Sequence, residues 1–517
     1  MTYPTKSRCL CDKIPNIVNT NIFREYDIRG MANRDLPNDL VRALGLAISE
    51  TACAGSGSSP TIVVARDCRL TSPRIFVALT RGLLDKANVI DIGIVPTPVA
   101  YFAQQLLLPA ATVMITGSHN PAEDNGFKIM IGTTTLHGEA IAQLGRRAVD
   151  LLGQSTARRT MTTQEGRMLI ARDGTDAYLA KLLGQPSLRP SRMTTHDVTG
   201  AYLSRAAAAI KLGSRRFKIV VDAGNGAGGP TAVALYERLG FDVVPLYCNF
   251  DGKFPHHHPD PTQPENLGDL ITTVAREGAE LGIALDGDAD RLGVVDATGK
   301  ILWGDQLMIL LGRAVLDEVP GARFVGEVKC SQAMYDELAA AGGTVEMWKV
   351  GHSLIKERMK EIGAQLAGEM SGHMFFAHRW LGFDDGIYAG ARLLELLSRG
   401  SQPLAELASA LPAMINTPEI RIDCADDRKV GLVATVTERL RRDPAVTRVI
   451  DIDGVRATFA DGWGLLRASN TQPALVMRCE ASSAARLAEI KATLEAHLAV
   501  AEGADRTIPV NIQCNVL

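Results

Sequence analysis

The sequence predicts a chain of several α/β domains, and three observations point to this fold class. At 517 residues the chain is too long for one hydrophobic core, and domains of about 100 to 200 residues would give three or four of them. Short apolar runs rich in β-branched residues end in Gly or Asp and recur along most of the chain. A stretch with helix-like patterning follows these runs, which is typical of alternating strands and helices.

Four of the apolar runs are the clearest strand candidates: residues 61–67 (TIVVARD), 111–120 (ATVMITGSHN), 218–226 (KIVVDAGNG) and 281–291 (LGIALDGDADR). Continuous apolar runs of this length favour buried parallel strands. In open α/β sheets the chemistry collects at the carboxyl ends of strands, where polar clusters stand in this chain. The last helix has an apolar face that indicates core packing. Its residues are Leu487, Ile490, Leu494 and Leu498.

Composition and charge favour a globular protein that binds small molecules. Hydrophobic residues make up 46% of the chain and charged residues 22%. A net charge of -3 gives no field for holding nucleic acid or an anionic membrane, so an anion must be held by a local cluster. The nine cysteines show no metal or disulfide spacing, and no stretch reaches the roughly 18 apolar residues of a membrane span. We expect a cytoplasmic protein with no nucleic acid, membrane or obligatory protein partner.

Three aspartates, Asp286, Asp288 and Asp290, alternate at the end of an apolar run. Carboxylates this close repel one another, and a bound hard cation with oxygen ligands is the simplest way to make the arrangement favourable. Magnesium is the expected ion. The EF-hand calcium loop does not fit, because it requires Gly and Glu where Arg291 and Ala297 stand. The alternative is a solvated acidic turn.

The segment 115–130 (ITGSHNPAEDNGFKIM) places Ser118, His119 and Asn120 directly after an apolar run. The G-x-S-x-G nucleophile elbow of acyl hydrolases would need Gly at position 120, so that class is disfavoured. A serine at a strand end can instead carry a phosphoryl group, whose charge of about -1.5 to -2 requires a divalent ion, a lysine and backbone donors. Lys128 and the aspartate-bound cation could supply the positive charge. The alternative is a hydrogen-bonded turn with His119 as an ordinary polar residue.

Two further clusters have the parts of a sugar-phosphate site. In GEMSGH, the side chains of Glu369, Ser371 and His373 can point the same way if the segment is extended, as recognition of sugar hydroxyls would require. RASNTQP combines a guanidinium with hydroxyls and turn amides, which suits a phosphate monoester. It contains Arg467, Ser469, Asn470 and Thr471. Taken alone, a polar strand end or a Ser/Thr turn would look the same.

In this order, the clusters resemble the motifs of one family, the α-D-phosphohexomutases, and specifically its bacterial phosphomannomutase/phosphoglucomutase branch. The matching segments are FREYDIRG (23–30), TGSHNPAEDNGFK (116–128), DGDADR (286–291), GEMSGH (368–373) and RASNTQP (467–473). The resemblance runs from about residue 21 to the C-terminus. The departures are an N-terminal extension and an extra segment near residues 166–200, and neither contains a motif.

The resemblance implies an α/β fold of four domains around a central cleft, in which three similar α/β domains with mixed sheets precede a smaller, mobile C-terminal α+β domain. The implied division is an extension (1–20), domain I with the phosphoserine loop (21–163), domain II with the metal loop (164–300), domain III with the sugar-binding loop (301–413) and a phosphate-binding domain IV (414–517).

The resemblance also implies a role for each motif residue. Ser118 would be phosphorylated and would hold Mg²⁺ together with the three aspartates. Glu369 and Ser371 would bind the 3- and 4-hydroxyls of the sugar, with His373 beside them, and the RASNTQP residues would bind the phosphate that is not reacting. Further substrate contacts would come from Tyr26, Arg29, Arg291, Lys329 and His352.

The implied reaction interconverts hexose 1-phosphate and hexose 6-phosphate through phosphoserine and a hexose 1,6-bisphosphate, which also serves as activator. Lys128 and Arg29 would neutralise charge, and His119, Lys128 and His352 are candidates for the general acid and base. The alternatives are a phosphoglucosamine mutase, which Gly117 and Met370 disfavour, and a metal-dependent sugar phosphatase. A phosphatase has no use for a second phosphate site.

Overall fold

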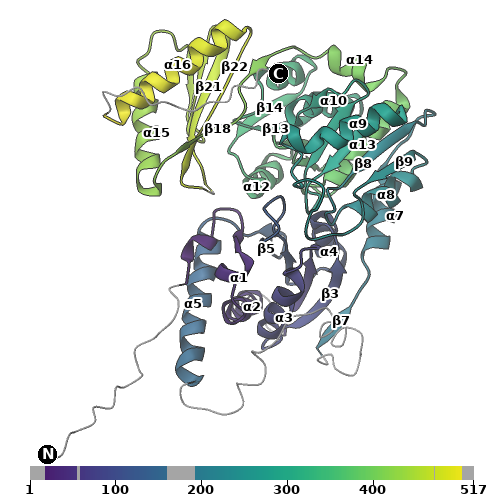
Figure 1. Cartoon of the computed structure of the whole chain (residues 1–517), viewed down its shortest axis with the longest axis vertical. Coiled ribbons are helices and arrows are strands. Elements are labelled where there is room, and N and C mark those ends of the chain that lie inside the picture. Colours follow the sequence, from purple (N-terminus) through teal and green to yellow (C-terminus); the bar gives the residue numbers. More distant parts are fainter. Residues whose placement is uncertain (1–17, 55–58, 160–191, 471, 504–517) are drawn as a thin grey trace, which may run out of the picture.

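The computed structural model describes residues 18–54, 59–159, 192–470 and 472–503 (Figure 1). These residues form four sheets flanked by helices, which we call domains I to IV in chain order. Most of the expected N-terminal extension and of the extra segment at residues 166–200 lies outside the described residues. Within the described ranges, no helix is both long and apolar enough to cross a membrane.

Domain I, in the lower part of Figure 1, carries the serine segment on a mixed sheet. Strands β2 and β4 are parallel, whereas β5 is antiparallel to β4. One face of the sheet packs on α2, α3 and α5 and the other on α4, because successive side chains of a strand point to opposite faces. The sheet order is β1 (Ile28–Met31), β5 (Asp124–Ile131), β4 (Ala111–Ile115), β2 (Thr61–Arg66), β3 (Asn88–Ile94) and β7 (Met193–Thr195), with β6 (Thr134–Thr135) beside β5. The helices are α1 (Ala32–Asp35), α2 (Asn38–Cys53), α3 (Ser72–Leu83), α4 (Thr97–Leu107) and α5 (Glu139–Arg159).

Domain II has the sheet order β12 (Ile301–Leu302), β11 (Leu292–Asp296), β10 (Leu281–Leu285), β8 (Lys218–Asp222) and β9 (Asp242–Leu246). Strand β8 runs parallel to β9 and β10, and β11 is antiparallel to β10. The apolar runs of β8 and β10 are buried along almost their whole length, as parallel strands covered on both faces require. The helices are α7 (Thr199–Ala209), α8 (Gly229–Arg238) and α9 (Gly268–Glu277).

Domain III repeats the plan with the order β14 (Thr344–Trp348), β13 (Arg323–Glu327), β15 (Leu366–Gly368) and β16 (Met374–Phe376). Its helix α13 contacts α8 and β11 of domain II as well as its own α10 and β16, so domains II and III share one hydrophobic core. The helices are α10 (Gly304–Glu318), α11 (Gln332–Ala340), α12 (His352–Ile362), α13 (Gly386–Arg399) and α14 (Leu404–Ser409).

Domain IV is smaller and has an antiparallel sheet covered by two helices, at the upper left of Figure 1. The expected apolar face of the last helix is confirmed, because Ile490, Leu494 and Leu498 are buried in this core and Leu487 packs against it. The sheet contains β17 (Ile415–Asn416), β22 (Ala474–Ala481), β21 (Gly462–Ala468), β20 (Val455–Phe459) and β19 (Arg448–Ile450), with β18 (Ile420–Asp423) beside β22. The helices are α15 (Asp426–Leu440) and α16 (Ala484–Ala501).

The predicted fold class of three mixed α/β domains and a smaller C-terminal domain is confirmed. Two short strands differ from the expected division of the chain. Strand β7 follows residue 164 but joins the sheet of domain I, and β12 follows residue 300 but joins the sheet of domain II. Both are edge strands of two or three residues, whose pairing depends on which sheet edge is within reach.

Candidate active site

Ser118 lies beyond the end of β4, in a backbone conformation that few residues other than glycine adopt. Its φ of 48° falls in the left-handed region. The side chain is buried, and Ser118 Oγ donates a hydrogen bond to Asp286 Oδ2 at 2.8 Å. Since Asp286 directly follows β10, this bond joins the carboxyl ends of strands from domains I and II.

Asp286, Asp288 and Asp290 form a fully buried acidic cluster in which one carboxylate oxygen of each lies within 4.8 Å of the others. Burial raises the pKa of Asp286 well above its usual range, and the neighbouring Asp290 and Asp288 raise it further. Among the described residues, Asp288 Oδ1 and Asp290 Oδ1 have no hydrogen-bond partner. Buried carboxylate oxygens without partners are costly, so this donor set fits a hard divalent cation.

Besides Ser118, Lys128 and Thr97 of domain I contact the acidic cluster. Lys128 Nζ, on β5, donates to Asp288 Oδ2 at 2.8 Å and also to Asp290. Burial alone would lower the pKa of Lys128, but the carboxylates of Asp288 and Asp290 outweigh it and raise this pKa well above its usual value. At the start of α4, Thr97 Oγ1 donates to Asp288 Oδ2 at 2.6 Å, and Thr97 N–H donates to the Asp288 carbonyl at 2.9 Å. Hydrogen bonds across the domain I–II interface therefore hold the cluster in place.

His119 and Arg29 lie beside the serine. His119 Nδ1 is 3.2 Å from Ser118 Oγ. Burial lowers the pKa of the His119 imidazole well below its usual value, and the positive charges of Arg291 and Arg29 lower it further. Arg29 Nη1 donates to Asn120 Oδ1 at 2.6 Å, which connects β1 to the serine segment. The surroundings of Ser118 thus combine a neutral imidazole with a guanidinium.

The expected sugar-binding residues lie between β15 and β16, and the segment is a tight turn instead of an extended one. Glu369 N–H donates to the His373 carbonyl at 3.0 Å, and Gly372 N–H donates to the Glu369 carbonyl at 3.0 Å. The turn still brings the three side chains together, because Ser371 Oγ donates to Glu369 Oε2 at 3.3 Å and His373 Nε2 lies 3.9 Å from the same oxygen. The three side chains are therefore brought together by a hairpin turn, and not by the alternation of side chains along an extended strand.

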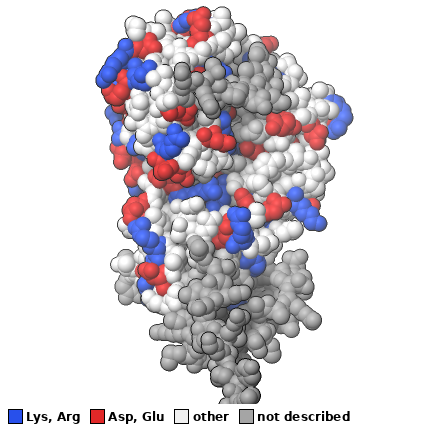
Figure 2. Space-filling view, turned by 60° about the vertical axis from the view of Figure 1, so that its left-hand side comes forward, with Lys and Arg blue, Asp and Glu red and all other residues white. Residues whose placement is uncertain are grey.

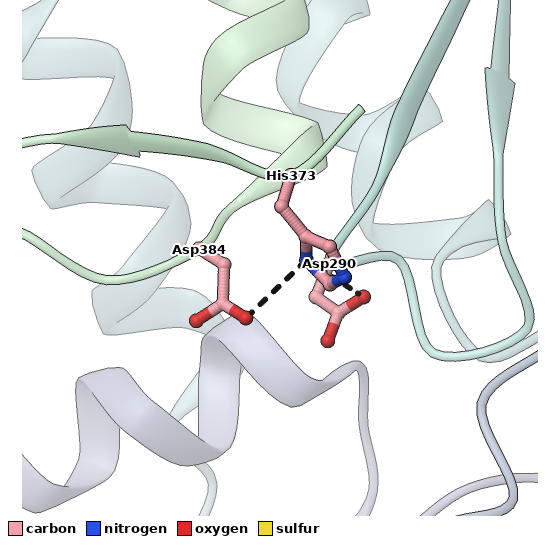
Figure 3. Close-up of side chains that lie close together, drawn as sticks. All are labelled: Asp290, His373 and Asp384. Atoms are coloured by element: carbon pink, nitrogen blue, oxygen red, sulfur yellow. Dashed lines mark ion pairs between the residues drawn. The ribbon is translucent and has the colours of Figure 1, made fainter. Parts of the chain in front are cut away.

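His373 lies between the carboxylates of Asp290 and Asp384 (Figure 3). Its Nδ1 is 3.5 Å from Asp290 Oδ1 and 3.4 Å from Asp384 Oδ2, so by spacing the three could hold a metal ion. However, Arg291 Nε donates to His373 Nε2 at 3.0 Å. Since an arginine nitrogen only donates, Nε2 is the acceptor and the imidazole carries its proton on Nδ1. That nitrogen faces the carboxylates as a donor, which disfavours a metal ion there.

Asp384 also faces a second histidine. Its Oδ2 lies 3.6 Å from His352 Nδ1, and its Oδ1 accepts from Lys356 Nζ at 2.9 Å. Burial would raise the pKa of Asp384, but Lys356 and the two imidazoles hold it well below its usual range, so Asp384 stays ionised. Burial, helped by Lys356, lowers the pKa of His352 well below its usual value. One ionised carboxylate thus faces the Nδ1 atoms of both histidines.

Domain IV reaches domains I and III through a short chain of hydrogen bonds. Asn470 Nδ2 donates to the hydroxyl of Tyr26, and Tyr26 in turn donates to the Val350 carbonyl at 2.6 Å. Beside this chain, Arg467 Nη2 pairs with Asp453 Oδ2 at 3.1 Å. Residues expected to contact substrate therefore link three domains.

Other residues that were expected to contact the substrate already have partners within the chain. Ser469 Oγ accepts from Gln472 N–H at 3.2 Å, which is the turn that the sequence allowed as an alternative. Thr471 lies outside the described residues. In domain III, Lys329 Nζ pairs with Glu419 Oε2 at 3.2 Å. A bound phosphate would have to compete with Glu419 for this ammonium group.

A cavity of 760 Å³ opens between domains I, III and IV, and Asp453, Asn470 and Lys349 are among the residues that line it. In Figure 2, lysine and arginine side chains lie interspersed with acidic ones across the middle of one face of the molecule. The net charge of the chain is only -3, so the attraction for an anion would have to come from local basic groups and not from the overall charge.

The chain matches the models of one known protein family along most of its length. The four phosphoglucomutase/phosphomannomutase models match in order: alpha/beta/alpha domain I at residues 20–144, domain II at 201–299, domain III at 303–415 and the C-terminal domain at 419–497. The chain belongs to the phosphoglucomutase/phosphomannomutase family.

Several relatives in this family span nearly the whole chain. A phosphomannomutase/phosphoglucomutase of Pseudomonas putida is 43% identical over 92% of this chain and 95% of its own length. A phosphoglucomutase of Neisseria gonorrhoeae is 41% identical over 92% of this chain and 96% of its own. A crystal structure of a family protein from Burkholderia thailandensis is 39% identical, covers 95% of this chain and 99% of that one, and has a TM-score of 0.81.

Sequence motifs missed three residues that contact the site of this family member. Thr97 lies in a largely apolar segment, and Lys356 lies in a charged run (356–361, KERMKE) that is typical of a solvated helix face. Asp384 stands in the acidic pair Asp384–Asp385. That pair follows an aromatic residue and precedes a helix, so it was open to interpretation as a helix N-cap, a role that Asp385 does have.

Proposed function

We propose that this chain interconverts the 1-phosphate and 6-phosphate of mannose, glucose or both, through a phosphoserine at Ser118 and a hexose 1,6-bisphosphate. The observation that carries this proposal is the 2.8 Å hydrogen bond from Ser118 Oγ to Asp286. It places a buried hydroxyl at the edge of an acidic cluster that fits a divalent cation. Relatives over 92% of the chain bear the names phosphomannomutase/phosphoglucomutase and phosphoglucomutase, which supports the same reaction.

In this proposal Ser118, Asp286, Asp288 and Asp290 would hold Mg²⁺, which would supply positive charge to the phosphoryl group. The chain's own residues position and protect the reacting groups. The serine is buried, which keeps water from the phosphoester. Arg29 lies beside the serine segment and brings a permanent positive charge to it.

Each transfer exchanges one P–O bond for another. The free hydroxyl of the sugar phosphate forms a bond to phosphorus and loses its proton to a base, while the bond from phosphorus to Ser118 Oγ breaks and that oxygen is protonated. The bisphosphate then returns its other phosphoryl group to Ser118. His119 is the best placed to exchange the serine proton, because its Nδ1 is 3.2 Å from Oγ. Lys128 already donates to two carboxylates, so it is less suited to accept a proton. We therefore propose His352 as the general acid and base for the sugar hydroxyl.

The other motif residues are proposed to bind substrate. Glu369, Ser371 and His373 would bind the sugar hydroxyls, since their side chains already meet in one turn. The phosphate that is not reacting would be bound at the junction of domains I, III and IV. The residues proposed there are Arg467, Ser469, Asn470 and Thr471. Further contacts with the substrate are proposed from Tyr26, Arg29, Arg291, Lys329 and His352.

The compartment, the partners and the domain division of the chain are also proposals. We propose that it acts in the cytoplasm on small-molecule sugar phosphates, without an obligatory protein partner. The six cysteines in the described part of the chain are all free thiols, which suits a reducing compartment. The proposed division remains 1–20, 21–163, 164–300, 301–413 and 414–517, with β7 and β12 crossing it as described.

The test is to compare turnover of glucose, mannose and glucosamine 1-phosphates, with a trace of glucose 1,6-bisphosphate, with and without a chelator. We expect the 6-phosphates of glucose or mannose to form only with the divalent ion present. Preference for the glucosamine ester would identify a phosphoglucosamine mutase. Release of inorganic phosphate without any 6-phosphate would identify a phosphatase.

A further inference from the structure

Arg69 is a fully buried arginine whose guanidinium faces the main chain of the serine segment. Arg69 Nη2 donates to the Ser118 carbonyl at 2.7 Å and to the Asn120 carbonyl at 2.6 Å. Arg69 Nη1 donates to the Asp124 carbonyl at 3.1 Å and also to the Pro121 carbonyl. Four carbonyl groups within residues 118–124 therefore converge on one cation.

The position of this guanidinium is fixed from three sides. Asp67 Oδ2 accepts from Arg69 Nε at 3.1 Å and from Gly117 N–H at 3.1 Å, so one carboxylate holds both the arginine and the serine segment. A Cβ at Gly117 would lie 2.6 Å from Arg69 Cζ, so glycine allows this close approach. The ring of Phe254, from domain II, lies over the guanidinium with 5.0 Å between Cζ and the ring centroid.

We propose that Arg69 is a positioning residue that holds Ser118 in its left-handed conformation, with Oγ directed at Asp286. This inference rests on the proposed function, since it assigns the reason why Ser118 is correctly placed for phosphoryl transfer. A left-handed backbone is unfavourable for serine and persists only where surrounding contacts impose it. The contacts here are charge-assisted hydrogen bonds from Arg69 to the carbonyls of the segment. Without the guanidinium, these buried carbonyls would lack partners and the segment would rearrange to satisfy them.

The test compares Arg69→Met and Arg69→Lys with the matched variant Arg66→Met. Arg66 is a buried arginine on β2 that pairs with Asp91 at 2.8 Å and lies over Phe76, and neither contact involves the serine segment. Arg69→Met should lower kcat about 10²-fold, as expected for a displacement of roughly 1 Å, while KM stays within about threefold. Arg69→Lys should recover part of the loss, and Arg66→Met should leave kcat within about threefold of the parent chain.

A second readout does not depend on turnover. Hydrogen exchange of the amides at residues 116–124 should be faster in folded Arg69→Met than in the parent chain, and unchanged in Arg66→Met. Turnover and exchange in Arg69→Met that match those of Arg66→Met would overturn the inference. If Arg69→Met does not fold, Arg69→Lys decides: full kcat with unchanged exchange overturns the inference. Failure of the parent chain to interconvert sugar phosphates would instead refute the proposed function, while the exchange comparison would still test Arg69.

Discussion

Replacing Gly287 with alanine should displace the serine segment without removing any functional group. Gly287 lies between Asp286 and Asp288, and a Cβ there would stand 2.3 Å from the Ser118 carbonyl oxygen and 3.4 Å from Pro259 Cγ. Since close C···O contacts in proteins are about 3.3 Å or longer, the serine segment and the aspartate segment would have to separate by about 1 Å. A shift of about 1 Å can cost about 10²-fold in rate, and overpacking typically costs about 1–3 kcal/mol of stability.

The assay is the kcat for conversion of hexose 1-phosphate at saturating Mg²⁺, with thermal unfolding as a check on folding. Gly268→Ala is the matched control, because no atom lies within 4 Å of a Cβ added at the start of α9. We expect kcat to fall by about 10²-fold in Gly287→Ala and to stay near that of the parent chain in Gly268→Ala. A folded Gly287→Ala variant that turns over as fast as the control would refute the idea that the two segments must keep this spacing.

The remaining predictions concern the serine, the phosphate site, the metal and a buried acid. Ser118→Ala should lose most turnover while keeping its affinity for sugar phosphate, and unlike the parent chain it should gain no added mass of about 80 Da after incubation with hexose 1,6-bisphosphate. Arg467→Ala removes the partner of Asp453 and should chiefly raise KM; a loss confined to kcat would contradict its assignment to phosphate binding. EDTA should abolish turnover and added Mg²⁺ should restore it, so activity that survives chelation would exclude a metal role for the aspartates. Burial raises the pKa of Asp385 to about 7. Because an unfolded aspartate has a pKa of about 3.9, the folded chain holds an extra proton between roughly pH 4 and 7, and the free energy of unfolding should fall by up to about 4 kcal/mol as the pH rises through that window. Urea unfolding at pH 5 and 8 should show a smaller fall for Asp385→Asn, and an equal fall in both proteins would contradict this origin.

The sequence was most informative where one short segment contains both a structural signal and a chemical one. The runs that became β4 and β10 are apolar on both faces, so their burial and their parallel pairing with β2 and β8 follow from residue type, whereas their antiparallel pairing with β5 and β11 does not. Ser118 and Asp286 stand directly after these runs, and the carboxyl ends of neighbouring strands gather on one edge. The position of each segment at a strand end was therefore predictable, whereas their meeting depends on the packing of domains I and II, because the two strands lie in different sheets.

The rest depends on packing that no local pattern encodes. Asp384 reaches His352 and His373 because α13 begins at that point and packs across the sheets of two domains. Arg69 lies in the loop between strand β2 and helix α3, where the sequence alone predicts an exposed basic residue. The fold instead buries its side chain against the serine segment. The left-handed backbone of Ser118 is likewise imposed by its surroundings, since serine has no intrinsic preference for it.

The hydrogen bonds from Ser118 and Thr97 to the aspartates have a consequence for motion. Domains I and II cannot draw apart without separating the serine from the aspartates proposed to hold the cation. A bisphosphate that must reverse end for end has to do so against a surface that stays still. We expect the space for that reversal to open on the side of domain IV, where, among the described residues, Asn470 donates to the Tyr26 hydroxyl of domain I.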